Sequence, residues 1–222
     1  MGETIKLTAS DGHSFDAYRA APAGTPKGGV VVIQEIFGVN SHIREVADSY
    51  AADGYLAIAP SVFDRQETNV ELGYDGDSMT AGRTLKDNAS YEAAVLDLTA
   101  AVEAMSGAGK VGTVGYCWGG TLSYLCSTRV PGVSGSVVYY GGQIVPFNDE
   151  ALQTPCQMHF GERDAGIPLS DVDAIKAAHP EADVHVYPAD HGFNCDQRGS
   201  YDKPSCDLAR ERTDAFFAAN LG

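Results

Sequence analysis

The run GYCWGG, residues 115–120, offers the clearest chemistry in the sequence. It has the form G-x-C-x-G, which is the nucleophile-elbow pattern with a thiol in place of the usual hydroxyl. In that motif the nucleophile stands on a sharp turn from a strand to a helix, and small flanking residues let the helix approach the strand. An apolar run precedes Cys117 and a helix-compatible run follows it. We therefore expect Cys117 to be a catalytic nucleophile.

Two later residues complete a candidate triad in the chain order that this motif requires, which is nucleophile, acid and histidine. Asp164 lies in a loop rich in Gly and Pro just after an apolar run, and His191 follows the next one. Side chains at the carboxyl ends of parallel strands meet at one edge of the sheet, where such sheets bind ligands. We predict that Asp164 orients the imidazole of His191, which supports a thiolate at Cys117.

Other interpretations of these residues stay open. Glu162 and Asp190 are alternative carboxylates for the histidine. A free cysteine is most often a small buried hydrophobe, so Cys117 could lack a chemical role. A glycine-rich turn could hold a phosphate, but neither GxGxxG nor GxxxxGK[ST] occurs. Two further hypotheses are a non-catalytic binding protein with the same fold, and a thiol-based redox protein in which Cys126 is the nearest second thiol.

We expect no metal and no organic cofactor. His191, Cys195 and Cys206 could supply three ligands to zinc, but no C-x-x-C pair accompanies them. Five other histidines lack the sequence context of His191 and are expected to be structural or solvated: His13, His42, His159, His179 and His185.

The periodicity of apolar residues predicts the elements that must position these side chains. A hairpin is expected over residues 5–17, with a turn at Asp11-Gly12. A strand buried on both faces is expected over residues 30–33, and further strands are expected over residues 55–59, 111–116, 133–140, 157–160 and 184–187. Helices are expected from a cap at Ser41 to an end at Gly54, over residues 84–105, and over residues 208–219. Residues 61–82 are acidic and without clear period, so we expect an irregular excursion there.

This alternation of strands and helices predicts the α/β class, with a mostly parallel central sheet and helices on both faces. The length of 222 residues suits one domain, and no linker divides the chain. We therefore expect a single domain over residues 1–222.

Five runs carry a resemblance to a known family: QEIFGVN at 34–40, AIAP at 57–60, GYCWGG at 115–120, YYG at 139–141 and HGF at 191–193. On these runs the chain resembles the dienelactone hydrolase (carboxymethylenebutenolidase) family over nearly its whole length. The resemblance implies an α/β-hydrolase fold and hydrolysis of an ester or lactone through a thioester acyl-enzyme. Its Cys-His-Asp triad maps onto Cys117, His191 and Asp164, without a metal or cofactor.

The resemblance also implies roles for residues around the triad. Glu35 matches the acidic residue beside the thiol, and the backbone N–H groups of Ile36 and Trp118 match the oxyanion hole. Both assignments follow from the family motifs and not from spacing.

The family's namesake substrate is a carboxylated enol-lactone, whose carboxylate is held by two arginines. In this sequence the place of one of them holds Cys195, which leaves Arg83 and Arg198 as candidates. Both stand in segments that look like loops. Phe37 and Tyr140 complete the expected substrate-binding residues.

Composition limits the partners and the compartment. The formal net charge of −15 argues against binding to nucleic acid or to anionic lipid. No apolar run is long enough to span a membrane. Five scattered cysteines and no evident secretory signal suit a reducing cytoplasm. We expect a small-molecule ester or lactone as the partner, and a monomer or weak homo-oligomer.

Overall fold

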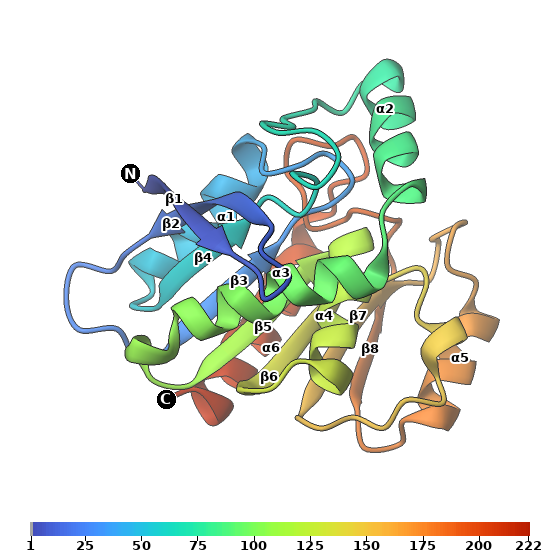
Figure 1. Ribbon diagram of the computed structural model, residues 1–222. Coiled ribbons are helices and arrows are strands. Elements are labelled where there is room, and N and C mark those ends of the chain that lie inside the picture. The colour runs from blue at the N-terminus through green and yellow to red at the C-terminus, as the bar shows by residue number, and fades with distance from the viewer. Residues whose placement is uncertain (1) are drawn as a thin grey trace.

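A computed structural model describes residues 2–222, and one sheet of eight strands runs through them (Figure 1). The strands are β1 (Glu3–Thr8), β2 (Ser14–Ala20), β3 (Gly29–Ile33), β4 (Leu56–Pro60), β5 (Val111–Tyr116), β6 (Val133–Tyr139), β7 (Cys156–Gly161) and β8 (Asp183–Tyr187). Their order in the sheet is β1-β2-β4-β3-β5-β6-β7-β8. Strands β3 to β8 are parallel, whereas β2 pairs antiparallel with both β1 and β4. The mostly parallel α/β sheet is therefore confirmed.

Helices cover both faces of this sheet. Helices α3 (Tyr91–Ala104) and α4 (Trp118–Arg129) lie in front of it in Figure 1, and α1 (Ser41–Ala52) and α6 (Lys203–Asn220) lie behind it. Helix α5 (Leu169–Ala178) follows β7, and α2 (Gly76–Asp87) projects above the body of the molecule. Among the helices within residues 2–222, none combines the length and apolarity needed to cross a bilayer.

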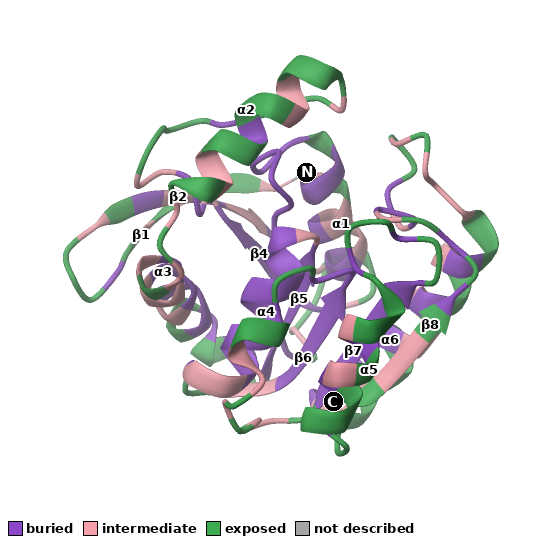
Figure 2. Ribbon diagram, turned by 90° about the vertical axis from the view of Figure 1, so that its right-hand side faces the viewer, coloured by how far each residue is buried: buried purple, intermediate pink, exposed green. Residues whose placement is uncertain are grey.

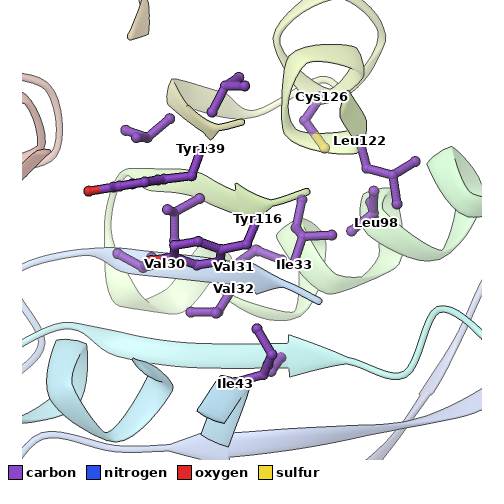
Figure 3. Packing of buried hydrophobic residues seen from close by; sticks show 14 of the residues in the cluster. Val30, Val31, Val32, Ile33, Ile43, Leu98, Tyr116, Leu122, Cys126 and Tyr139 are labelled. Atoms are coloured by element: carbon purple, nitrogen blue, oxygen red, sulfur yellow. The ribbon is translucent and has the colours of Figure 1, made fainter. Parts of the chain in front are cut away.

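The core lies between the sheet and its two helical layers. Residues 30–33 of β3 are fully buried, because helices cover both faces of this strand. Figure 3 shows them beside Tyr116 and Tyr139 of the neighbouring strands, with Leu98 of α3 and Leu122 of α4 packed nearby. In Figure 2 the central strands are mostly buried, whereas α2 is almost entirely exposed or half-buried. A continuous apolar run is what a strand covered on both faces requires.

Two expectations about residues 61–105 were wrong. The excursion does not stay irregular to residue 82, because α2 begins at Gly76, where the side chain of Asp75 accepts a hydrogen bond from the N–H of Ser78. The single helix expected over residues 84–105 is two helices, α2 and α3. Ser90 divides them because its hydroxyl caps α3, and serine favours this role over a helix interior. Helix α2 therefore stands apart from the sheet.

Three element ends also differ from expectation. Asn40, and not Ser41, caps α1 through a hydrogen bond from the N–H of Ile43 at 3.3 Å. Strand β6 ends at Tyr139, because Tyr140 has a φ of 41°. Helix α6 begins at Lys203, earlier than expected, since Asp202 caps it.

Candidate active site

The turn between β5 and α4 places Cys117 at the carboxyl edge of the sheet. Its backbone has φ 57° and ψ −119°, a conformation that is strained for a residue with a Cβ. The turn is held by hydrogen bonds from the N–H of Cys117 to the carbonyl of Tyr139 at 3.0 Å, and from the N–H of Gly120 to the carbonyl of Cys117 at 2.9 Å. The thiol is half-buried. This is the geometry of a nucleophile elbow.

Two glycines permit this turn by letting α4 approach the strands. A Cβ on Gly115 would lie 1.8 Å from the carbonyl oxygen of Gly119. A Cβ on Gly119 would lie 2.4 Å and 2.3 Å from the carbonyl oxygens of Ile33 and Gln34. Backbone atoms cannot shift this far without moving a whole strand, so the small residues of the motif are required by packing.

The structure brings Asp164 and His191 together from the loops after β7 and β8. The Nδ1 of His191 donates to Oδ2 of Asp164 at 2.6 Å, and the other carboxylate oxygen accepts from the N–H of Gly166 at 2.8 Å. The carboxylate is almost fully buried. Of the two alternative carboxylates, Glu162 is exposed, and Asp190 accepts from the backbone N–H of His191 at 2.7 Å. Asp164 therefore orients the imidazole.

The charge of His191 depends on Cys117. Burial is the largest single influence on the pKa of the imidazole, and it acts to lower that pKa. The charge of Cys117 and hydrogen bonds to Asp164 and Cys117 outweigh burial and raise the pKa from 6.5 to about 10. The protonation of the imidazole is therefore coupled to the charge of the neighbouring Cys117 side chain.

Two backbone N–H groups expected to receive an oxyanion flank the thiol. Trp118 is the first residue of α4, so its N–H has no acceptor within the helix. Ile36 lies in the loop after β3, and no backbone carbonyl of residues 2–222 accepts its N–H. Both groups are free of backbone partners at this edge of the sheet.

Glu35 has partners that the sequence did not reveal. Its side chain is 1% exposed, and Oε1 accepts from Nη1 of Arg198 at 3.0 Å. The hydroxyl of Tyr74 donates to Oε2 at 3.3 Å and accepts from the side-chain amide of Asn40 at 3.2 Å. Burial, followed by the charge of Glu35, raises the pKa of Tyr74 well above its ordinary value, so the phenol stays a donor. Within the described residues, Glu35 forms no hydrogen bond to Cys117.

A cavity of about 370 Å³ opens over the thiol. Its walls include most of the residues selected from the sequence: Ile36, Phe37, Arg83, Cys117, Asp164, His191 and Arg198. Tyr140 does not line it. The Tyr140 side chain is fully buried, and its ring centre lies 5.0 Å from that of His191. Tyr140 therefore packs against the imidazole and not against the cavity.

One face of α2 supplies lining residues that the sequence did not single out. Met79 and Lys86 line the cavity together with Arg83, which lies on this helix and not in a loop. Their spacing of four and three residues places all three on the same side of the helix. A second cavity, of about 180 Å³, shares Lys86, Cys117 and His191 with the first and extends toward Ile167. Cys117 thus lies in the walls of both cavities.

A different set of side chains could hold a metal. The ligand atoms of His42, Cys195 and Asp196 lie within 4.8 Å of one another. The zinc ligands considered from the sequence are not assembled in residues 2–222, since His191 bonds Asp164, and Cys206 donates from Sγ to the side-chain oxygen of Asn194 at 3.3 Å.

Comparison with known proteins gives a consistent set of relatives. The model of the dienelactone hydrolase family matches residues 15–221. A "Putative carboxymethylenebutenolidase" of Synechocystis sp. is 36% identical over 213 residues, covering 86% of each chain. A "Carboxymethylenebutenolidase" of Pseudomonas putida is 33% identical over 98% of this chain and 97% of its own. The crystal structure of a "Putative Dienelactone Hydrolase" from Klebsiella pneumoniae superposes with a TM-score of 0.85 at 30% identity, covering 97% of this chain and 99% of that one.

Proposed function

The chain belongs to the dienelactone hydrolase family and is a carboxylic ester hydrolase, and we propose that it cleaves a small ester or lactone with Cys117 as the nucleophile. One observation carries the proposal. Cys117 stands on a strained turn in the wall of a cavity, and the same wall contains His191, bonded to Asp164 at 2.6 Å. This arrangement of nucleophile, base and orienting acid is the one that covalent acyl transfer needs.

In the acylation step, the thiolate of Cys117 attacks the carbonyl carbon and forms a carbon–sulfur bond. The carbonyl electrons move onto oxygen, and the N–H groups of Ile36 and Trp118 would donate hydrogen bonds to this oxyanion. A well-placed oxyanion donor contributes about 3 kcal/mol in other enzymes. When the tetrahedral intermediate collapses, the alkoxide leaves with the proton of the His191 imidazolium. A thioester remains on the enzyme.

Deacylation needs His191 as a base. Once Cys117 is a thioester, its negative charge is gone, and that charge is the largest influence raising the pKa of His191. The imidazole then becomes a better acceptor for the proton of the attacking water. Water adds to the thioester carbonyl, the acid departs, and the thiolate and imidazolium are restored. Asp164 holds the same tautomer throughout.

Lining chemistry favours an anionic substrate. Arg83, Lys86 and Arg198 reach the larger cavity, although the formal net charge of the chain is −15. A local group of cations is what an anionic substrate requires against such a field. We therefore propose an ester or lactone that carries a carboxylate. Its charged part would occupy the larger cavity and its leaving group the smaller one.

The test combines activity with identification of the acylated residue. Nitrophenyl esters and small lactones are assayed with wild type, Cys117→Ala and the control Cys206→Ala, which removes a half-buried thiol outside the cavity. We expect Cys117→Ala to lose about 10⁴-fold or more in kcat, and the control to retain activity. Acid-quenched wild type should carry one acyl group, on the peptide containing Cys117. Wild-type turnover by Cys117→Ala, or an acyl group elsewhere, would contradict the proposal.

The same thiol could instead serve redox chemistry, but its nearest sequence partner is unsuited to that role. Cys126 is 1% exposed in α4, and burial raises its pKa strongly, so it is a poor resolving thiol. Peroxide consumption in the presence of dithiothreitol should therefore be the same for wild type and Cys117→Ala.

Three broader assignments remain proposals. We propose a reducing, cytoplasmic location, supported by five cysteines that are all free thiols. A single domain over residues 1–222 predicts one cooperative unfolding transition. A monomer or weak homo-oligomer predicts a sedimentation coefficient that changes little with dilution.

A further inference from the structure

A cluster of side chains that could bind a metal lies near Glu35 and has no part in the proposed hydrolysis. His42 is the second residue of α1, and Cys195 and Asp196 follow in the loop between β8 and α6. The thiol, imidazole and carboxylate ligand atoms lie within 4.8 Å of one another. About 150 residues of sequence separate the histidine from its two neighbours, so only the fold brings them together.

His42 is buried without hydrogen bonds that would account for its burial. The residue is 4% exposed, and its Nε2 has no partner among residues 2–222. Its Nδ1 lies 3.8 Å from Oδ1 of Asp196, which is beyond hydrogen-bond reach. Neither ring nitrogen forms a hydrogen bond within residues 2–222, and a cation bound by the ring would offset part of the cost of burying it.

The backbone of Cys195 is fixed by hydrogen bonds within its own loop. Its N–H donates to the carbonyl of Gly192 at 3.0 Å, and its carbonyl accepts from the N–H of Arg198 at 3.1 Å. The side chain is fully buried. The thiol is therefore carried by a loop whose backbone is hydrogen-bonded through both the N–H and the carbonyl of Cys195.

Asp196 provides the opening to solvent. Its side chain is 63% exposed, so an ion can reach the cluster from outside and the carboxylate can move to meet it. The charges that act on His42 favour a bound cation. They are three carboxylates, those of Glu35, Asp196 and Glu45, against one guanidinium, that of Arg198.

We propose that His42, Cys195 and Asp196 bind a thiophilic divalent cation such as Zn²⁺, with water as a fourth ligand. One thiolate, one imidazole and one carboxylate are ligands that Zn²⁺ accepts in tetrahedral sites. With metal–ligand distances of about 2.0–2.3 Å, the three atoms must close by up to about 1 Å, which the exposed Asp196 can provide. Binding forms a sulfur–metal bond and releases the thiol proton to solvent. The ion would tie α1 to the loop that carries Arg198.

Cobalt is the probe that separates this site from the catalytic thiol. Co²⁺ is titrated into reduced protein, and the thiolate-to-cobalt charge-transfer band is followed. Wild type and Cys117→Ala should both show one equivalent of the band, since the site shares no residue with the triad. Cys195→Ser should lose the band, and Asp196→Asn should weaken binding by about tenfold or more. Cys206→Ser removes a thiol of the same region that bonds Asn194, and it should behave as wild type.

Calorimetry with Zn²⁺ gives a second readout. In buffers of different ionisation enthalpy, wild type should release about one proton per ion bound, and Cys195→Ser none. No stoichiometric binding, a band retained in Cys195→Ser, or a band lost in Cys117→Ala would overturn the site. If Cys195→Ser does not fold, as judged by circular dichroism, Asp196→Asn decides, because its exposed side chain has no packing role. None of these outcomes bears on ester hydrolysis.

Discussion

Replacing Cys117 with alanine should lower the pKa of His191. The imidazole is buried, and burial alone would place its pKa below 6.5, yet that pKa is about 10. The largest influence that raises it is the charge of Cys117, followed by the hydrogen bonds that the imidazole donates to Asp164 and Cys117 and by the charge of Asp164. Alanine removes the charge and the hydrogen bond of the thiol and leaves those of the carboxylate.

The magnitude follows from this order. The favourable influences together must exceed the net rise from 6.5 to about 10, because they also overcome burial. Cys117 supplies the stronger charge effect and Asp164 the stronger hydrogen bond, so the thiol accounts for at least about half. The pKa of His191 should therefore fall by about 2 or more in Cys117→Ala, which is on the order of 3 kcal/mol less stabilisation of the imidazolium.

Titration followed by NMR measures this change. The Cε1–H resonances of the six histidines are recorded against pH in both proteins, and His191→Gln assigns the signal of His191. The other five histidines are the internal control and should titrate alike in both. A pKa of His191 near 6.5 in wild type, or the same raised pKa in both proteins, would refute the thiolate–imidazolium pair. The variant has the charge state of the acyl-enzyme, so the lowered pKa also reports the base of deacylation.

Three other changes should have distinct effects. Asp164→Asn should reduce kcat for nitrophenyl acetate by about 10³–10⁴-fold with little change in KM, because it favours the wrong imidazole tautomer. Arg83→Gln should raise KM about tenfold or more for a carboxylated ester and leave a neutral ester unchanged in the same assay, since a charge-assisted hydrogen bond contributes about 1.5–3 kcal/mol. Gly119→Ala should lower the urea-derived free energy of unfolding by about 3 kcal/mol or more, whereas Gly107→Ala, whose Cβ would meet nothing within 4 Å, should not.

The three residues predicted to form the triad could be placed at one edge of the sheet from sequence because each of them is marked locally. The elbow glycines surround Cys117, and Asp164 and His191 each follow an apolar strand within a few residues. In a parallel sheet, the carboxyl ends of such strands meet at one edge, so local signals were enough to place three distant residues together. The strand positions were predicted for the same reason, since a strand buried on both faces is a plain apolar run.

Residues on α2 could not be located in this way. This helix buries only Gly82, so it has no apolar stripe of the kind that marks a helix packed on a core. Its cavity-facing side chains, Met79, Arg83 and Lys86, are one apolar and two charged residues, whose spacing carries meaning only once the helix is known. The helix-capping residues Asp75 and Ser90 could not be distinguished, because the stretch around them is acidic and contains many other polar residues.

The pairing of Glu35 with Arg198 changes how the departure at Cys195 is interpreted. Arg198 is 14% exposed and already bonded to a buried carboxylate 163 positions away in sequence, so a substrate anion must compete with Glu35 for it. Removing the guanidinium would leave that carboxylate buried and unpaired, which costs about 3–5 kcal/mol in other proteins. In the absence of substrate, the guanidinium of Arg198 is therefore already paired with the carboxylate of Glu35. The cations able to receive a carboxylate without breaking a buried pair are Arg83 and Lys86, both on the exposed helix α2. The family resemblance places an arginine where this chain has Cys195, so we expect recognition of a substrate carboxylate to depend on α2 and not on the loop after β8.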